Sequence, residues 1–489
     1  MVFSTAVFLF RFLPCVLLVY VLLCAGARLL RRSPWPVANL WLLLASLFFY
    51  AWGERERVLL MLASILGNWV FGLWVHGRRE AGATRLPVAL ALLFNLGLLG
   101  WFKYANFFVE NVEALTGDEL TWTRVVLPIG ISFFTFQALS YVIDVARGDA
   151  PVQRNPLHFA TYVALFPQLV AGPIVRYRDV ALQLVDRRIG LAEFTSGARR
   201  FSIGLAKKVL VANTVAGLAD VAFDSVPGAQ LSPALAWAGA LAYTVQIYFD
   251  FSGYSDMAIG LGRMFGFRFL ENFRWPYASA SVTEFWRRWH ISLSSWFRDY
   301  LYIPLGGNRR GSFRTGLHLV TVFFLCGLWH GASWNFVVWG LFHGAFLVIE
   351  RVGLGAWLER RPRLLRHAYT LLVAVVGWVF FRAESLPRAL EHLSAMAFLQ
   401  AGEPAAWPLG LYLERPVLLA LVLGLCGSLP WAPALGRKVG AWADDARAWV
   451  RLAHWKLELL GGLALVLALL ASAARLAADT YNPFIYFRF

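Results

Sequence analysis

Apolar residues come in long blocks along this chain, and short polar segments separate the blocks. A helix needs roughly 20 mostly apolar residues to cross a bilayer. Blocks that reach or approach this length are residues 6–27, 36–52, 57–75, 86–102, 125–143, 157–174, 209–223, 231–249, 315–329, 332–349, 368–381, 414–433 and 457–477. The pattern predicts an all-α polytopic membrane protein with about 11–13 membrane-embedded helices.

Composition supports one integral-membrane domain. Of the 489 residues, 59% are hydrophobic and the mean hydropathy is +0.58, whereas soluble domains are roughly 45–50% apolar. We therefore expect a single domain over residues 1–489, with N-terminal helices in 1–124, a core in 125–350, and C-terminal helices and a tail in 351–489.

The formal net charge of +16 has to be interpreted for a membrane protein. Basic residues gather in short segments between apolar blocks, at 28–32, 76–80, 309–314 and 360–366. This is the positive-inside pattern, so these segments are expected on the cytoplasmic side against anionic lipid headgroups. It argues against nucleic acid as a partner.

Polar residues enter the apolar blocks from Val125 onward. Ionisable and amide side chains are costly in lipid, so they should face a protein interior or a wet cavity. The residues concerned are Gln137, Asp144, Gln168, Gln246, Asp250 and Asp256. Gly172-Pro173 and residues 251–253 are expected to break helices there. Each polar residue alone could simply bond helices together, but the set predicts a central polar cavity.

Residues 283–311 are too charged to span a bilayer. Apolar side chains recur at steps of three and four, on the face formed by Phe285, Trp289, Leu293, Trp296, Tyr300 and Ile303. This spacing predicts an amphipathic interfacial helix. His290 should lie on the shoulder of its apolar face, and residues 305–308 should close the helix with a turn.

His330 follows about 16 residues after the basic segment at 309–314, which is roughly 24 Å of helix and places the ring well inside the bilayer. Gly327 and Gly331 would let a ligand or another backbone approach closely. The imidazole could be a neutral structural group, or it could take a proton from an attacking hydroxyl. His343 lies on the next helix. Without a G-x-S-x-G or H-E-x-x-H motif, serine-hydrolase and zinc chemistry are disfavoured. The four cysteines lie in apolar runs without metal-ligand spacing, so no metal site is expected.

Two stretches carry a family resemblance, FWRRWHISLSSWFRDYLYIPLGGNRRG (285–311) and LWHGASWNFVVWGLFHG (328–344). They resemble the membrane-bound O-acyltransferase family (MBOAT), in particular its AlgI-like branch of alginate O-acetyltransferases. The resemblance extends to residues 103–107, 127–145, 167–179, 248–262 and 376–384. It implies a ring of helices around a central funnel and tunnel, and acyl transfer from a cytosolic thioester to an acceptor on the other side.

The resemblance also implies site residues. His330 corresponds to the family's catalytic histidine and His290 to its second motif histidine. Acetyl-CoA is implied as donor substrate, with no tightly bound cofactor. Further candidates for donor or tunnel contacts are Trp286, Arg287, Arg288, Asn308, Trp329, Gln137 and Asp250. The arginines of 287–314 could attract the phosphates of coenzyme A or anchor the chain at the membrane surface.

The chain ends DTYNPFIYFRF. Its aromatic residues are typical of an interfacial anchor. FIYFRF also resembles the ending of a small partner protein in the related D-alanyl transfer system, which suggests Tyr486 as a transient acyl acceptor.

These observations predict a multi-pass enzyme of the bacterial cytoplasmic membrane. The resemblance implies that it serves O-acetylation of an extracytoplasmic polysaccharide such as alginate, with periplasmic acetyltransferases as partners. Alternatives are O-acetylation of peptidoglycan or cellulose, or D-alanylation-type transfer. From other classes, a proton-coupled transporter would also use buried ionisable groups, and a scaffold would give no reason for His330.

Overall fold

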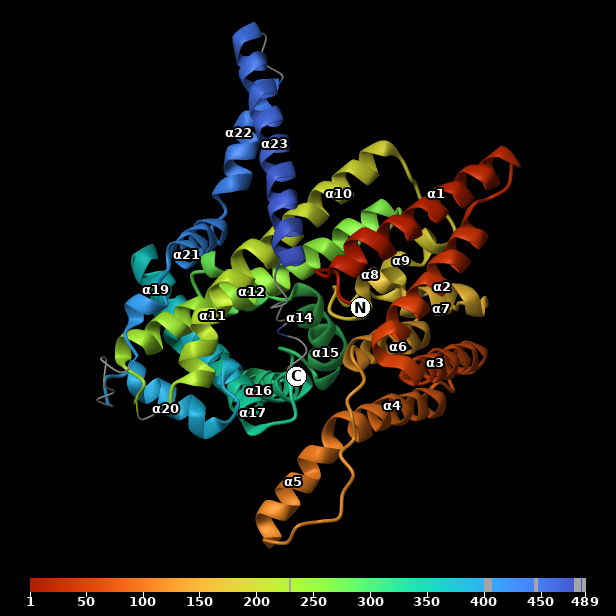
Figure 1. Cartoon of the computed structure of the whole chain (residues 1–489). Coiled ribbons are helices and arrows are strands. Elements are labelled where there is room, and N and C mark those ends of the chain that lie inside the picture. Colours follow the sequence, from red (N-terminus) through yellow and green to blue (C-terminus); the bar gives the residue numbers. More distant parts are fainter. Residues whose placement is uncertain (228–229, 400–406, 444–446, 479–484, 486–489) are drawn as a thin grey trace. The chain divides into compact units, whose positions relative to one another are not determined.

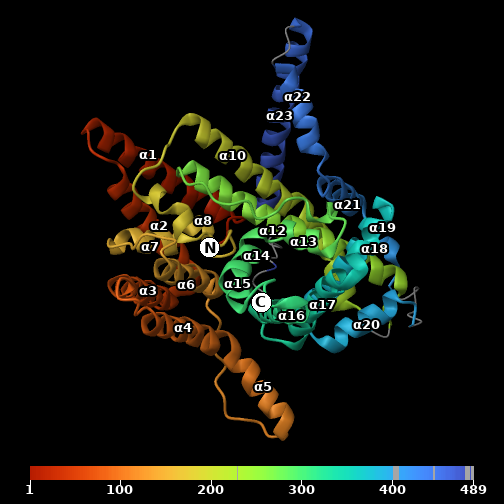
Figure 2. The same ribbon diagram turned by 180° about the vertical axis from the view of Figure 1, so that it is seen from behind.

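The chain forms two compact units in this computed structural model, which describes residues 1–227, 230–399, 407–443, 447–478 and 485. The first unit comprises Met1–Phe201 with Met257–Leu270, and the second comprises Ser202–Asp256 with Glu271–Phe489. The described residues form helices and loops without a strand, as Figures 1 and 2 show from opposite sides. The all-α prediction is confirmed. The ring with its tunnel and the three-segment division stay predictions.

The first unit is built from helices of very different length. They are α1 (Leu13–Leu29), α2 (Trp35–Glu54), α3 (Val58–Arg79), α4 (Arg85–Leu99), α5 (Ala105–Thr116), α6 (Ile131–Arg147), α7 (Pro156–Ala164), α8 (Phe166–Leu169) and α9 (Tyr177–Val180). Helices α3, α4 and α6 pack side by side (Figures 1 and 2). Glycines with positive φ bound α6, Gly130 at 77° and Gly148 at 81°, because few other residues adopt this conformation without strain.

Two long helices join the units, α10 (Leu191–Ala206), which continues in a π-turn, and α12 (Pro233–Met264). The second unit adds α11 (Asn213–Asp220), α13 (Val282–Arg288), α14 (Ile291–Phe297), α15 (Ile303–Leu305), α16 (Gly311–His330), α17 (Trp334–Ile349), α18 (Gly355–Glu359), α19 (Arg363–Arg382), α20 (Leu386–Met396), α21 (Arg415–Gly427), α22 (Trp431–Ala443) and α23 (Ala448–Ala478). Helices α22 and α23 pack against each other as a hairpin (Figure 1).

Eight helical stretches among the described residues are long and apolar enough to cross a membrane, with α21 as a shorter apolar helix. One stretch, Trp35–Arg79, is counted once although Arg55, at φ 48°, separates α2 from α3. The multi-pass prediction is confirmed. The expected 11–13 helices also counted shorter and more polar segments. These segments do not meet the length and composition required of a membrane-crossing helix.

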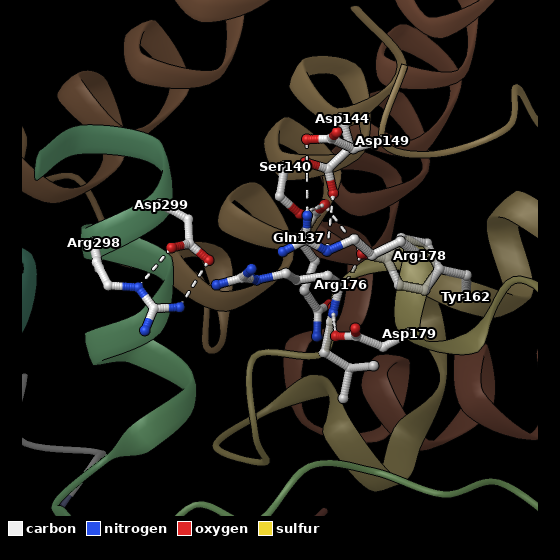
Figure 3. A network of polar contacts seen from close by, with 11 residues as sticks. Gln137, Ser140, Asp144, Asp149, Tyr162, Arg176, Arg178, Asp179, Arg298 and Asp299 are labelled. Carbon is white, nitrogen blue, oxygen red and sulfur yellow. Dashed lines mark hydrogen bonds and ion pairs between the residues drawn. The ribbon is translucent and has the colours of Figure 1, made fainter. Parts of the chain in front are cut away.

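Five of the six polar residues predicted to face the interior are buried, and Asp256 is 15% exposed and paired with Lys207. Gln137, Asp144, Gln168, Gln246 and Asp250 are all at most 4% exposed. Figure 3 shows part of this set in the first unit, where Arg178 lies 3.8 Å from Asp144. Ionisable groups in lipid require such partners.

Of the two predicted helix breaks, one is present. The chain leaves the helix after Leu169 and runs as turns and loop through Gly172-Pro173, as expected. Residues 251–253 do not break α12, which is continuous. A Cβ on Gly253 would lie 2.8 Å from the carbonyl oxygen of Gly204. This glycine therefore lets two helices approach closely, which is its other common role in membrane proteins.

The segment 283–311 is not one helix, contrary to the prediction. It is interrupted between α13 and α14, where His290 has a φ of 44°. The predicted apolar face is correct for Phe285, Trp289, Leu293, Trp296 and Tyr300, which are at most 9% exposed. Ile303 is exposed. The predicted turn at residues 305–308 is present, with Gly306 and Gly307 at positive φ.

Candidate active site

His330 is the last residue of α16, where the chain turns into α17. Two glycines bring these helices together: a Cβ on Gly327 would lie 2.3 Å from the carbonyl oxygen of Phe336, and one on Gly340 2.2 Å from that of Phe323. Of the two partners considered for Gly327, a ligand or a backbone, the structure shows a backbone. The close contact holds His330 on a rigid helix pair, which suits a group that must keep its orientation.

Aromatic rings surround His330, which is 5% exposed. The rings of Trp329, Trp339 and Phe381 contact it edge to face at centroid distances of 5.0, 5.0 and 5.1 Å. A small cavity of about 10 Å³ borders the ring, which is close to the least space that holds one water molecule. Its lining residues are Ile247, Phe251, Trp289, His330, Trp339, Trp378, Phe381 and Ile485.

His290 is completely buried, so its predicted place on the shoulder of a helix is wrong. Its Nδ1 lies 3.1 Å from Oδ1 of Asn272. The same oxygen accepts the backbone N–H and the hydroxyl of Ser292, at 3.2 and 2.9 Å. Because Oδ1 can only accept, Nδ1 must carry the hydrogen and Nε2 must present its lone pair. No described residue bonds this Nε2.

Burial also decides the charge of His290. Desolvation lowers the pKa of His290 to about 3, since an apolar environment disfavours the charged form. The ring is therefore neutral at physiological pH. A neutral imidazole with an open Nε2 can accept a hydrogen bond or a proton.

Trp329 joins the two predicted histidines. Its ring centroid lies 6.2 Å from that of His290 and 5.0 Å from that of His330. The structure thus brings together three residues that the sequence predicted as site residues.

A pocket of about 230 Å³ opens beside Trp286 in the second unit. Its wall is mostly apolar, and Arg287, Arg298 and Tyr302 contribute polar groups. Trp286 in turn contacts Trp339, with ring centroids 5.6 Å apart. The rings of Trp286 and Trp339 therefore lie between this pocket and His330.

His343 was noted in the sequence without a role. It is 1% exposed and lies between Trp286 and Trp339, at ring distances of 5.1 and 5.3 Å. Neither ring nitrogen bonds a described residue. Room for the ring depends on Gly377, because a Cβ there would lie 2.5 Å from Nε2 of His343.

Asp250 forms a buried ion pair near the cavity that borders His330. Its Oδ1 lies 2.7 Å from Nζ of Lys208, and both side chains are 2% exposed. Its Oδ2 accepts the backbone N–H of Ile485 at 3.0 Å. Ile485 also lines the His330 cavity, so a residue of the C-terminal tail lies at the site. Tyr486 itself lies outside the described residues.

Three other predicted residues have local partners. Arg288 pairs with Glu284 one turn earlier, and the exposed Asn308 accepts a hydrogen bond from the hydroxyl of Tyr302. Gln137 belongs to the first unit and is fully buried. Its backbone carbonyl oxygen accepts a hydrogen bond from the hydroxyl of Tyr162 at 3.1 Å (Figure 3). None of these contacts involves either histidine.

Sequence reasoning missed the partners of the site. Lys208 could have been found, because a lysine and an aspartate in apolar segments must neutralise each other. Nothing in the sequence around Asn272 or Glu350 indicated that they contact the site in this way. Glu350 accepts the backbone N–H groups of Val282 and Thr283 at 2.6 and 2.9 Å and so fixes the start of α13. Among the described residues, no group of three or more His, Cys, Asp or Glu side chains could hold a metal ion.

The sequence is similar to several known proteins. The sequence profile of the membrane-bound O-acyltransferase family matches residues 87–384. The chain is 44% identical to a probable alginate O-acetylase AlgI of Pseudomonas putida and 42% identical to that of Pseudomonas aeruginosa, in both cases over 100% of each chain. It is 38% identical to a peptidoglycan O-acetyltransferase of Helicobacter pylori over 82% of this chain and 80% of the relative.

Proposed function

The chain belongs to the membrane-bound O-acyltransferase family, and we propose that it passes an acetyl group from cytosolic acetyl-CoA across the bacterial cytoplasmic membrane for O-acetylation of alginate or a similar polysaccharide. Family membership makes it an O-acyltransferase. The proposal of alginate rests on the full-length similarity to alginate O-acetylases. Peptidoglycan is the second candidate acceptor, because a peptidoglycan O-acetyltransferase is also similar over most of the chain.

One observation carries the mechanism: His330 lies in an aromatic cage that leaves a cavity of only about 10 Å³, at the end of two closely packed helices. In the proposed reaction, a hydroxyl oxygen attacks the carbonyl carbon of the acetyl thioester while His330 takes the hydroxyl proton. The carbon–sulfur bond then breaks, and the thiolate leaves with the proton from the imidazolium. Excluding water favours transfer over hydrolysis of the thioester.

The pocket beside Trp286 supports a place for the donor. Its apolar wall would suit the pantetheine arm, and Arg287 and Arg298 would attract phosphates. His290 would orient the thioester end by accepting, at Nε2, a hydrogen bond from the pantetheine amide N–H next to the sulfur. The rings of Trp286 and Trp339 would have to move for the acetyl group to reach His330, so we propose that donor binding is coupled to their rearrangement.

The tail supports a relay. Ile485 lies at the His330 cavity, and Tyr486 is the next residue. We propose that the Tyr486 hydroxyl is the first acceptor and forms an acetyl ester. A hydroxyl of the polysaccharide, or of a periplasmic acetyltransferase, would then attack this ester and restore the tyrosine.

The test uses the full chain in nanodiscs with radiolabelled acetyl-CoA. His330→Ala should lower release of coenzyme A by roughly 10²–10⁴, while His76→Ala, a histidine of the first unit, should not. Tyr486→Phe should abolish label on the protein. Unchanged turnover in His330→Ala would refute the mechanism, and full transfer to acceptor by Tyr486→Phe would refute the relay.

A further inference from the structure

The first unit contains a pocket of about 890 Å³ that the transfer reaction does not use. Its charged lining residues are Arg187, Arg188, Arg263 and Arg268 with Asp186 and Glu193, a net charge of +2 from four cations and two anions. Gln183 and Ser196 add polar groups, and Phe267 and Phe269 add apolar surface. The lining thus combines positive charge with aromatic rings.

Arg187 is the strongest observation, because it is a buried cation that forms no ion pair with a carboxylate among the described residues. It is 5% exposed. Its guanidinium donates to the hydroxyl of Tyr20 at 3.1 and 3.2 Å and to Oδ1 of Asn39 at 2.7 Å. It also donates to the backbone oxygens of Phe265 and Gln183, at 3.0 and 3.1 Å. All of these acceptors are neutral.

Aromatic rings complete the surroundings of Arg187. The guanidinium carbon lies 4.6 Å from the ring centroid of Trp35 and 4.3 Å from that of Phe267. These contacts hold the group in one orientation but do not neutralise its charge. A buried charge without a counter-charge is unfavourable, so an anion in the pocket would stabilise the fold.

Two further arginines are available to such an anion. Arg188 and Arg268 line the pocket, are exposed, and form no ion pair with the described residues. The segment that carries Arg268 is held in place, because its backbone N–H donates to Oε1 of Gln183 at 2.7 Å. The start of α10 also borders the pocket, and a helix N-terminus favours negative charge.

The neighbourhood of the pocket is typical of a membrane interface. Leu182, Val185 and Leu191 are 81%, 56% and 79% exposed and lie next to lining residues in the sequence. Tyr20, which binds Arg187, belongs to α1, and α1 ends at the basic segment 28–32. The positive-inside rule places this end of α1 on the cytoplasmic side, where the lipid headgroups are anionic.

We propose that this pocket binds the phosphate-bearing headgroup of an anionic phospholipid. The phosphate would complete the buried charge of Arg187 and bond Arg188 and Arg268, and the exposed aliphatic side chains would contact the acyl chains. Basic pockets between membrane helices bind anionic headgroups in this way.

The experiment measures lipid retained by the full chain after reconstitution in nanodiscs of phosphatidylglycerol or phosphatidylcholine. Native mass spectrometry counts bound lipid, and thermal unfolding reports stabilisation. The variant is Arg188→Gln with Arg268→Gln, two exposed arginines whose loss should not unfold the chain. The control is Arg360→Gln with Arg361→Gln, which removes the same charge from another basic segment.

We expect wild type and control to retain phosphatidylglycerol over phosphatidylcholine, and the pocket variant to bind it roughly 10- to 30-fold more weakly. Equal retention of the two lipids, or equal loss in pocket variant and control, would overturn the proposal. Inorganic pyrophosphate is added to detergent-purified, phosphatidylglycerol-free protein as a second arm. If it stabilises wild type as much as the lipid does, the pocket recognises soluble phosphate and the lipid assignment is wrong.

Discussion

Removing Asp250 should destabilise the chain far more than removing a partly exposed aspartate of the same helix. At 2.7 Å and an effective dielectric constant of about 20, the attraction between Lys208 and Asp250 is about 6 kcal/mol. Desolvation of both groups offsets much of this attraction. Asp250→Ala removes this carboxylate from a buried ammonium, and such losses cost about 3–5 kcal/mol.

The matched control lies two turns along the same helix. Asp256 pairs with Lys207 at 2.7 Å, but their side chains are 15% and 27% exposed. Water therefore solvates the remaining charge in Asp256→Ala, and the loss should be about 1 kcal/mol. Thermal unfolding of the detergent-purified variants measures both. Equal midpoints for Asp250→Ala, Asp256→Ala and wild type would refute the burial argument.

A double variant separates stability from the tail contact. Lys208→Met with Asp250→Leu removes both charges, and apolar replacements of buried pairs are often neutral or stabilising. Most of the lost stability should return. The bond from the Ile485 N–H to Asp250 stays absent, so acetyl transfer should remain low. A double variant as unstable as Asp250→Ala, or one with full transfer activity, would contradict this role of the pair.

Two other predictions concern packing and pH. Gly327→Ala should lower stability by about 1–3 kcal/mol and reduce turnover, because the added Cβ would lie 2.3 Å from the Phe336 carbonyl oxygen. The control Gly316→Ala should be tolerated, because its Cβ would lie 3.6 Å from Val348. Equal thermal unfolding midpoints for the two variants would contradict the close approach of α16 and α17. The pKa of His290 in the folded chain is about 3, below its ordinary value of 6.5. Unfolding therefore takes up a proton below pH 6.5. The contribution of His290 to stability is lost as the pH falls from 6.5 towards 3, by about 1.4 kcal/mol per pH unit. His290→Gln should make the unfolding midpoint less sensitive to pH in that window, and an unchanged slope would contradict a neutral buried ring.

The sequence predicted the fold class because apolar blocks and basic loops are local patterns. It also predicted that Gln137 and Asp250 are buried, since lipid excludes them. It did not predict the break at His290. The apolar period continues through that residue, and only tertiary contacts, such as the bond to Asn272, favour the left-handed backbone there.

The same limit applies to glycines and partners. Gly253 and Gly172 look alike in sequence, but one lies at a helix–helix contact and the other in a loop. Which role applies depends on whether a second backbone approaches. The contact between Trp329 and both histidines depends likewise on how α13, α14 and α16 fold together, which no spacing within one segment specifies.

Helix α23 has a consequence for how the tail reaches the site. Only 6% of the residues in the most apolar stretch of this helix are buried. Near its end, Arg475 donates a hydrogen bond to the hydroxyl of Thr214 at 2.7 Å. Residues 479–484 alone connect this helix to Ile485. Because Ile485 belongs to the same chain as Asp250, their contact is intramolecular, and intramolecular contacts can correspond to effective concentrations in the millimolar range. The contact at Asp250 therefore needs only a millimolar dissociation constant to stay occupied. The same peptide added separately would have to be supplied at millimolar concentration to replace it.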